Sequence, residues 1–302
     1  MSDKKKKESI YNEWDISTSE EEVEEKVEVI SDSFTKDTVS SSNLKLNDDI
    51  DLEIKDVKRI DYALEINDLV KSYGRKQVLK GLNLKVKKGE VFGFIGKNGV
   101  GKSTTIDCVV GLKEANSGDI LILGKDAIRD PLETKMLIGY VPSVPTTYEM
   151  MTGNEYLQFI GSSYDMLQSA FDANYEYLLK KLTMSEADMN RPISEYSHGM
   201  KQKICLMASL IHNPKIWILD EPTVGLDIIV YEVLLKMIRD FANNGKTVFI
   251  TSHSIDLVAK VCDRVAIVNN GVVELLIDLN KEPLKRRDLN KIFFKLYEQD
   301  IN

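Results

Sequence analysis

The stretch Gly96-Lys97-Asn98-Gly99-Val100-Gly101-Lys102-Ser103-Thr104 decides the fold of this chain. An apolar run at 91–95, typical of a buried strand, leads into it, and a helical segment at 104–110 follows it. Glycines at this spacing let the backbone curl so that its N–H groups point at phosphate oxygens, and the next helix directs its positive dipole end at the same anion. The stretch therefore predicts an α/β fold with a nucleotide site. The alternative, a glycine-rich turn without a ligand, does not account for the flanking strand and helix.

Single positions in this phosphate loop carry separate parts of the chemistry. Lys102 supplies positive charge to the β- and γ-phosphates, and the Ser103 hydroxyl is placed to bind Mg²⁺. The residues of the loop that we expect to contact the nucleotide are Gly96, Asn98, Gly99, Val100, Gly101, Lys102, Ser103 and Thr104.

A second motif lies far along the chain, where four apolar residues at 216–219 end in two adjacent carboxylates, Asp220 and Glu221. A buried strand would deliver Asp220 to the Mg²⁺ beside the phosphate loop. Glu221, at the tip of that strand, can polarise a water toward the γ-phosphate as a general base. Alone, this pattern is a strand followed by an acidic turn. Together with the phosphate loop it predicts a hydrolytic site.

Two further segments match a known family. The run Tyr196-Ser197-His198-Gly199-Met200-Lys201-Gln202-Lys203 contains a serine that can cap a following helix and a glycine that permits close backbone approach, so the helix N-terminus can hold an anion. A histidine follows a predicted strand in Thr251-Ser252-His253. With these motifs, the chain resembles the nucleotide-binding subunit of an ABC transporter over roughly residues 62–302.

The resemblance implies a role for each of these segments. In the family, Ser197 and Gly199 of the signature loop would contact the γ-phosphate bound by the opposite subunit, and His253 would contact the γ-phosphate of its own site. The segment Val224-Gly225-Leu226-Asp227 resembles the D-loop of the family, which implies that Asp227 belongs to the nucleotide site. Tyr73 matches the aromatic residue that stacks on adenine. A buried core tyrosine is the competing interpretation.

The family also implies a fold and an activity. The fold is a P-loop NTPase core with a RecA-like, mostly parallel sheet, an antiparallel β subdomain and an inserted α-helical signature subdomain at about 144–211. The activity is ATP hydrolysis with Mg²⁺ by two subunits that dimerise around two ATP molecules. The Tyr-Ser-x-Gly-Met form of the signature is similar to the branch that exports drugs, antimicrobial peptides and polymers through separate polytopic transmembrane subunits.

One position departs from the family pattern. Ser143 follows the strand at 138–141, where the family usually has a glutamine that contacts Mg²⁺ and the attacking water. Serine keeps a hydroxyl but is shorter, so a bridging water would replace the direct metal contact. We therefore expect slower or less tightly coupled hydrolysis.

Two other functions compete with the exporter interpretation of the whole chain. They are a non-transport ABC ATPase and a regulatory ATP-binding scaffold with weak hydrolysis.

Charge and composition narrow the class of partner. Residues 1–60 hold 17 acidic and 10 basic side chains, whereas residues 61–302 are nearly neutral with 31 and 30. Nucleic-acid binding needs clustered Lys and Arg, so we expect no nucleic-acid partner.

The three cysteines, Cys108, Cys205 and Cys262, do not have the spacing of a metal site or of a disulfide pair. No apolar run is long enough to cross a bilayer, which predicts a cytoplasmic protein attached to the inner face of the cell membrane through a partner.

The chain pattern predicts its organisation. Residues 1–60 are polar and predict a largely disordered acidic extension, in which 20–30 is either an interaction helix or an idle charged segment. The cassette then spans 61–302, with a helical pattern from 152 to about 211. Eight of the ten methionines lie between Met136 and Met207, either as core filling or as a contact surface for a partner. Strands are predicted at 63–69, 82–86, 91–95, 121–123, 138–141, 215–220, 246–251, 264–268 and 272–276.

Overall fold

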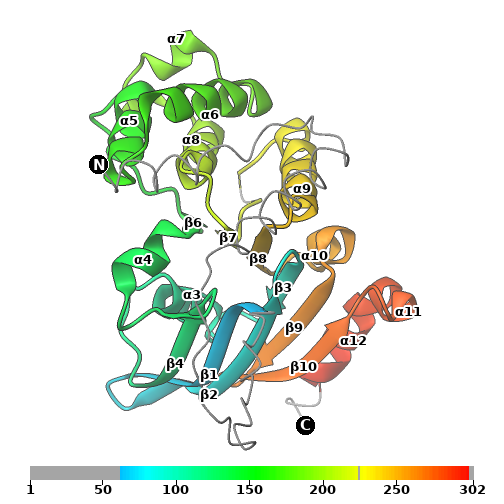
Figure 1. The fold of residues 1–302 in the computed structure, drawn as a ribbon. Helices are drawn as coiled ribbons and strands as arrows, with labels where there is room; N and C mark the ends of the chain where they lie inside the picture. Colours follow the sequence, from blue (N-terminus) through cyan, green and yellow to red (C-terminus); the bar gives the residue numbers. More distant parts are fainter. Residues whose placement is uncertain (1–61, 224, 299–302) are drawn as a thin grey trace, which may run out of the picture. The chain divides into compact units, whose positions relative to one another are not determined.

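A computed structural model of the chain describes residues 62–223 and 225–298 (Figure 1). The chain separates into two units, Met1–Arg59 and Ile60–Asn302. The first unit, with the predicted acidic extension and the amphipathic segment at 20–30, lies outside the described residues.

A six-stranded sheet in the order β10-β9-β3-β8-β7-β6 forms the centre of the second unit. Neighbouring strands pair in parallel, except that β10 pairs antiparallel to β9 across the turn Asn269-Asn270-Gly271. This arrangement confirms the predicted, mostly parallel core. Its strands are β3 (Val91–Ile95), β6 (Ile138–Val141), β7 (Ile216–Asp220), β8 (Thr247–Ser252), β9 (Arg264–Asn269) and β10 (Val272–Asp278).

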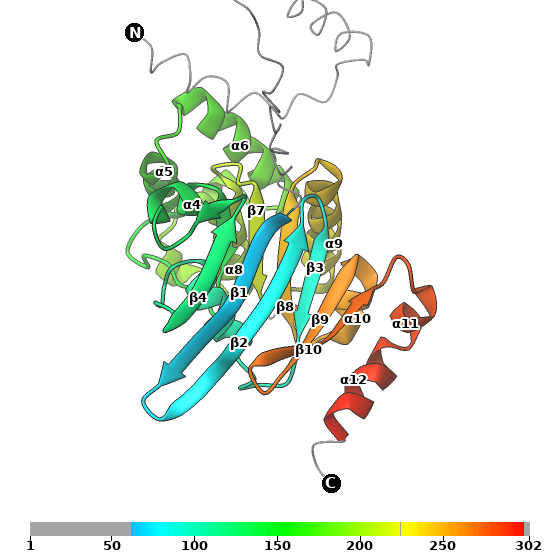
Figure 2. The ribbon, with the colours of Figure 1, turned by 60° about the horizontal axis from the view of Figure 1, so that its bottom comes forward.

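A second, antiparallel sheet has the order β2-β1-β4-β5 and is the predicted β subdomain (Figure 2). Along β2, the buried residues Leu82, Leu84 and Val86 alternate with exposed ones, the pattern of a sheet with one face in the core. The strands are β1 (Tyr62–Tyr73), β2 (Lys76–Lys87), β4 (Ser117–Ile122) and β5 (Lys125–Asp126).

Helices and loops make up the rest of the described chain, and four helices gather into one group between β6 and β7 (Figure 1). That group is the predicted helical insertion, and its first helix begins with a capping box between Thr152 and Glu155. The helical segments are α3 (Lys102–Val109), α4 (Pro131–Met136), α5 (Gly153–Ser163), α6 (Gln168–Lys181), α7 (Glu186–Met189), the 3₁₀ turn η2 (Ile193–Glu195), α8 (His198–Leu210), α9 (Ile228–Asn243), α10 (Ile255–Val261), α11 (Pro283–Arg287) and α12 (Leu289–Glu298).

The central sheet is buried on both faces. Phe92 and Phe94 of β3 lie in one core with the antiparallel sheet and with Ile106 of α3. Val91 and Ile95, the alternating residues of the same strand, lie in the other core, with residues of α8, α9 and α10. Because both faces are covered, the parallel strands are continuous apolar runs, which is why they were recognisable in the sequence.

Several predicted strands are shorter than the observed ones, and the prediction at 121–123 covers only the end of β4. The hairpin of β1 and β2 extends to the pair Tyr73–Lys76, well beyond the predicted ends at 69 and 82. Its outer half is mostly polar, and its buried Leu79 lies three positions from Leu82, which breaks the alternation of two that marks a strand in the sequence. Helix α4 was not predicted, because its six residues are too few to show a helical repeat of apolar positions.

A buried histidine joins the helical group to the central sheet. His212, which follows α8, is 8% exposed, and its Nε2 lies 3.0 Å from the carbonyl oxygen of Ile138 in β6. Its ring stacks on Tyr164, at the end of α5, with 3.7 Å between the ring centres. Burial lowers the pKa of His212 to about 4, so the ring is neutral near pH 7.

This burial makes the stability of the protein pH-dependent. The pKa of His212 falls from 6.5 in an exposed chain to about 4 when folded, so acid protonates the unfolded chain first. The stabilisation is complete above pH 6.5 and is lost as the pH falls toward 4, by about 1.4 kcal/mol per pH unit at most. His212→Gln should remove this part of the slope. Urea unfolding of both proteins from about pH 7.5 to about pH 4.5, a range that includes the ordinary histidine pKa, measures the slope. A difference in unfolding free energy between the two proteins that stays constant over this range would contradict the prediction.

Candidate functional site

The phosphate loop connects β3 to α3 and is pressed against neighbouring strands. Gly99 and Gly101 have φ of 84° and 113°, in the region that favours glycine. A side-chain carbon at Gly101 would lie 2.7 Å from Leu79, and one at Gly96 would lie 2.6 Å from the carbonyl oxygen of Val268. Glycine is therefore required at these positions by conformation and by space, and the predicted strand, loop and helix are confirmed.

Lys102 is folded into the loop that it follows. Its Nζ donates hydrogen bonds to the carbonyl oxygens of Gly96 at 2.8 Å and Lys97 at 3.2 Å, and only 7% of the residue is exposed. Burial lowers the pKa of Lys102, and the nearby Glu221 and Asp220 carboxylates oppose that shift. A buried cation of this kind, beside backbone N–H groups, suits a polyanion such as a phosphate chain.

Asp220 ends β7 and is fixed by the next strand. It is 2% exposed and lies opposite Thr251 of β8, whose hydroxyl donates to Asp220 Oδ1. Glu221 donates its backbone N–H to the carbonyl oxygen of Thr251 at 3.1 Å and has a φ of 50°. A left-handed conformation at a non-glycine residue costs on the order of 1–3 kcal/mol and is typical of functional sites.

The Glu221 carboxylate is held by three donors from the end of β8. Glu221 Oε2 lies 2.7 Å from His253 Nδ1 and accepts from the backbone N–H of His253 at 3.2 Å and from the Ser252 hydroxyl at 3.4 Å. The Glu221 side chain is 15% exposed and that of His253 is 65% exposed. The histidine therefore orients the carboxylate in the structure, an arrangement that the sequence motif did not indicate.

One pocket of about 370 Å³ brings eight of the sixteen predicted site residues together. Among the described residues, its lining does not include Gly96, Val100, Asp220 or His253. Because β3, β6 and β7 are parallel, the segments after their carboxyl ends reach the same edge of the sheet. Ser143, after β6, and Glu221, after β7, face the phosphate loop there. The pocket is lined by Lys76, Val78, Asn98, Gly99, Gly101, Lys102, Ser103, Thr104, Ser143 and Glu221.

Two of these lining residues, Lys76 and Val78, were missed by sequence reasoning. They lie on β2, directly after the hairpin turn at Gly74. Only the antiparallel pairing of β1 with β2 places this part of the chain over the loop, although its position just after Tyr73 was a usable signal.

Tyr73 lies at the tip of the same hairpin. It is 42% exposed, so the interpretation as a buried core tyrosine is wrong. The Nζ atoms of Lys71 and Lys113 each lie 5.4 Å from its ring centre, which is the geometry of cation–π contacts. The ring is available for stacking, and its contact with adenine stays a prediction.

The signature loop and the segment at 225–227 contact each other instead of the phosphate loop. Ser197 caps α8 by accepting the N–H of Met200 at 3.2 Å, as predicted. A side-chain carbon at Gly225 would lie 2.0 Å from the His198 ring, and one at Gly199 would lie 3.4 Å from the carbonyl oxygen of Gly225.

Asp227 acts as the N-cap of α9. Its Oδ1 accepts the N–H groups of Ile229 and Val230, both at 2.9 Å. Among the described residues, the lining of the phosphate-loop pocket includes neither Asp227 nor Ser197 nor Gly199. The capping role was readable from an aspartate before an apolar helix.

Comparison with known proteins identifies the family. A family profile described as ABC transporter matches residues 79–224. The ABC transporter ATP-binding protein NatA of Bacillus subtilis is 35% identical over 234 residues, which cover 76% of this chain and 95% of NatA. The chain belongs to the ABC transporter family. As an ATP-binding subunit of that family, it is an ATPase.

Other relatives agree with this assignment. The lantibiotic transport ATP-binding protein SrtF of Streptococcus pyogenes is 33% identical over 233 residues, with 77% of this chain and 98% of SrtF covered. A solved ATP-binding subunit of an ABC transporter superimposes with a TM-score of 0.73 at 28% identity and covers 78% of this chain and 99% of its own. Within the described part of this ABC subunit, no helix has the length and apolarity to span a membrane.

Ser143 generates a testable prediction about the rate of this ATPase. The serine is half-buried and lines the pocket with Ser103 and Glu221. Ser143→Gln would place a longer amide between the end of β6 and the pocket. We expect its kcat to rise by up to about tenfold, equivalent to ~1.4 kcal/mol of barrier.

The matched control is Ser143→Ala, which removes the hydroxyl without adding an amide and should not raise the rate. Steady-state phosphate release at saturating Mg²⁺ and ATP measures both variants. Equal rates for Ser143→Gln and the unaltered protein, or an equal rise in the alanine variant, would contradict the argument.

Proposed function

We propose that this chain is the ATP-hydrolysing subunit of an exporter, and that it works as a head-to-tail dimer around two ATP molecules. One observation carries the proposal: the pocket joins the phosphate loop to Glu221, whereas the capped N-terminus of α8, with Ser197 exposed, lies outside it. An exposed helix N-terminus can bind an anion. In the proposed dimer, Ser197 and Gly199 of each chain complete the site of the other.

The residues present fit a magnesium ion. The Ser103 hydroxyl lines the pocket, and the buried Asp220 carboxylate has one oxygen held by Thr251. Hydroxyl and carboxylate oxygens are the ligands that Mg²⁺ takes in phosphate sites. Ser143 supplies a further hydroxyl at the pocket wall. When bound, Mg²⁺ would neutralise charge on the phosphates.

Lys102, Glu221 and His253 have separate roles in the proposed reaction. Lys102, whose Nζ donates to two loop carbonyls, would direct its third N–H at phosphate oxygens and screen developing negative charge. Glu221 would accept the proton of the attacking water, and His253 would keep the carboxylate aimed at the pocket. ATP links the two chains through its γ-phosphate, so hydrolysis removes the link and favours opening.

An exposed apolar surface supports a membrane partner. Val144, Tyr148, Met150 and Phe159 are 70%, 57%, 90% and 43% exposed. The Tyr148 ring packs edge-on against Phe159 with 5.5 Å between the ring centres, so these two side chains adjoin. Exposed apolar patches mark interaction sites in soluble domains. The patch lies before and within α5, and we propose that a separate polytopic transmembrane subunit docks on it.

The methionines divide between the core and the surface. Met184, Met189 and Met207 are buried in the core, whereas Met150 belongs to the exposed patch. Docking on a permease would hold the subunit at the inner, cytoplasmic face of the cell membrane. The lantibiotic transport protein SrtF supports export as the direction.

Glu221→Gln separates this proposal from a scaffold without hydrolysis. Glutamine keeps the size of the side chain but cannot accept the proton, so kcat should fall by at least about 100-fold. ATP binding should persist, and the variant should form an ATP-dependent dimer in light scattering. Lys102→Ala is the matched control, because it should lose ATP binding and dimerisation together.

Two results would refute the mechanism. One is turnover by Glu221→Gln at the wild-type rate. The other is a Glu221→Gln protein that binds ATP but remains monomeric. Copurification with a polytopic membrane protein tests the transport part separately.

A further inference from the structure

The last helix of the described chain puts one side chain against the phosphate loop. Tyr297, in α12, is 3% exposed, and its hydroxyl donates to the carbonyl oxygen of Val268 in β9. The same hydroxyl accepts the backbone N–H of Lys97 at 3.2 Å. Tyr297 and Lys97 are 200 positions apart in the sequence.

The peptide group that donates to Tyr297 also accepts a hydrogen bond from Lys102. The N–H of Lys97 and the C=O of Gly96 belong to one planar peptide. That C=O accepts the hydrogen bond of Lys102 Nζ at 2.8 Å. The Tyr297 hydroxyl therefore fixes one end of the peptide whose other end orients the Lys102 ammonium.

Tyr297 also restrains the loop through its ring. Lys97 Nζ lies 4.4 Å from the ring centre, a cation–π contact, and the Tyr297 hydroxyl lies 3.1 Å from where a side-chain carbon on Gly96 would stand. The pocket with Glu221 does not have Tyr297 in its lining. Tyr297 lines a neighbouring pocket of about 300 Å³, together with Lys97, Asn98 and Gly99.

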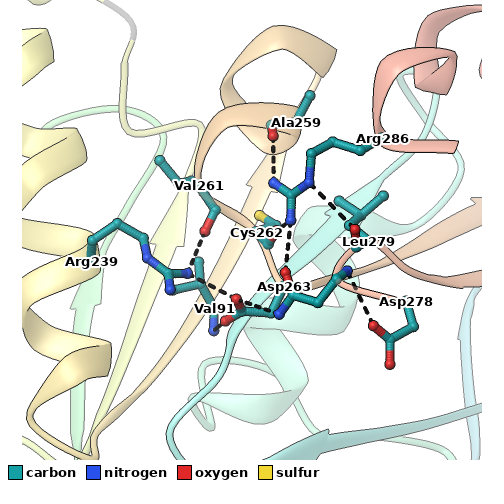
Figure 3. A network of polar contacts seen from close by, with 10 residues as sticks. Val91, Arg239, Ala259, Val261, Cys262, Asp263, Asp278, Leu279 and Arg286 are labelled. Atoms are coloured by element: carbon teal, nitrogen blue, oxygen red, sulfur yellow. Dashed lines mark hydrogen bonds and ion pairs between the residues drawn. The ribbon is translucent and has the colours of Figure 1, made fainter. Parts of the chain in front are cut away.

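The helix that carries Tyr297 is anchored to the cassette. Leu289, at the start of α12, is 1% exposed, and the Phe293 ring lies 4.8 Å from the Tyr297 ring. Before it, Arg286 of α11 donates to the carbonyl oxygens of Ala259 at 2.7 Å and Cys262 at 2.9 Å, at the end of α10 (Figure 3). Tyr297 is thus held in place, with its hydroxyl against the loop.

We propose that Tyr297 is a positioning residue for ATP binding: it fixes the peptide between Gly96 and Lys97 and thereby sets the orientation of Lys102. The inference rests on the proposed role of the phosphate loop in holding ATP. A loop that is already ordered loses less conformational freedom when the phosphates bind, so its contribution appears in affinity. Glu221 and its donors are untouched, and the phosphates of bound ATP themselves hold Lys102, so kcat should change less than the affinity.

The test is Tyr297→Phe, which keeps the ring and removes the hydroxyl. We expect the Kd for ATP, measured by calorimetry with Mg²⁺, and the KM to rise about five- to tenfold, as for loss of a hydrogen bond at a buried site. The kcat at saturating ATP should stay within about twofold, because the reacting groups are unchanged.

Phe294→Leu is the matched control, since Phe294 is an aromatic residue of the same helix that is 61% exposed and whose ring packs on Phe293 rather than on Tyr297. It should leave KM unchanged. An unchanged KM in Tyr297→Phe would overturn the proposal. An equal rise of KM in Phe294→Leu would also overturn it, since a general disturbance of α12 would then account for the effect.

A third variant separates this inference from the proposed site. Lys102→Ala should abolish ATP binding if the phosphate loop is the ATP site. Wild-type affinity in Lys102→Ala would refute the site and, with it, the role of Tyr297. Loss of binding in Lys102→Ala with unchanged affinity in Tyr297→Phe would refute the role of Tyr297 alone.

Discussion

Strands β7 and β8 pair in parallel so that Asp220 lies opposite Thr251, and the arrangement of the candidate site depends on that register. Thr251 serves both acidic residues: its hydroxyl donates to Asp220, and its carbonyl oxygen accepts the N–H of Glu221. Side chains alternate between the faces of a strand, so a slip by one residue would turn Asp220 to the opposite face. The buried apolar residues of β7 and β8 prevent such a slip, because it would exchange the residues in the two cores.

The same edge of the sheet concentrates opposite charges in a small space. Burial favours the neutral form of Lys102, while Asp220 and Glu221 favour its charged form. The ammonium is also bonded to two loop carbonyls, so its charge is compensated on several sides. Glu221 adopts a strained backbone conformation, which its hydrogen bonds to Thr251, Ser252 and His253 stabilise.

How far the sequence could predict this structure depended on the kind of signal. The bounds of β3 and β6 were predicted correctly, because short apolar runs there end in glycine, serine or proline. The outer half of the hairpin was not, because it is mostly polar and the spacing between the buried Leu79 and Leu82 breaks the alternating pattern of a strand. The phosphate loop, Ser143 and Glu221 could be predicted to converge, since parallel strands end at one edge. The bond between His253 and Glu221 and the contact of Tyr297 required the three-dimensional packing, because no local pattern encodes either.

Two distant segments of the chain meet the site through one short helix. His253 contacts Glu221, and Ser254, the next residue, caps α10 by accepting the N–H of Leu257. Arg286 bonds the last carbonyls at the other end of α10, and α12 then returns to the phosphate loop through Tyr297. A helix of seven residues is about 10 Å long. The segment that holds the Glu221 carboxylate and the segment that carries Tyr297 are therefore attached to opposite ends of one short helix, which explains how residues so far apart in the sequence meet at one edge of the sheet.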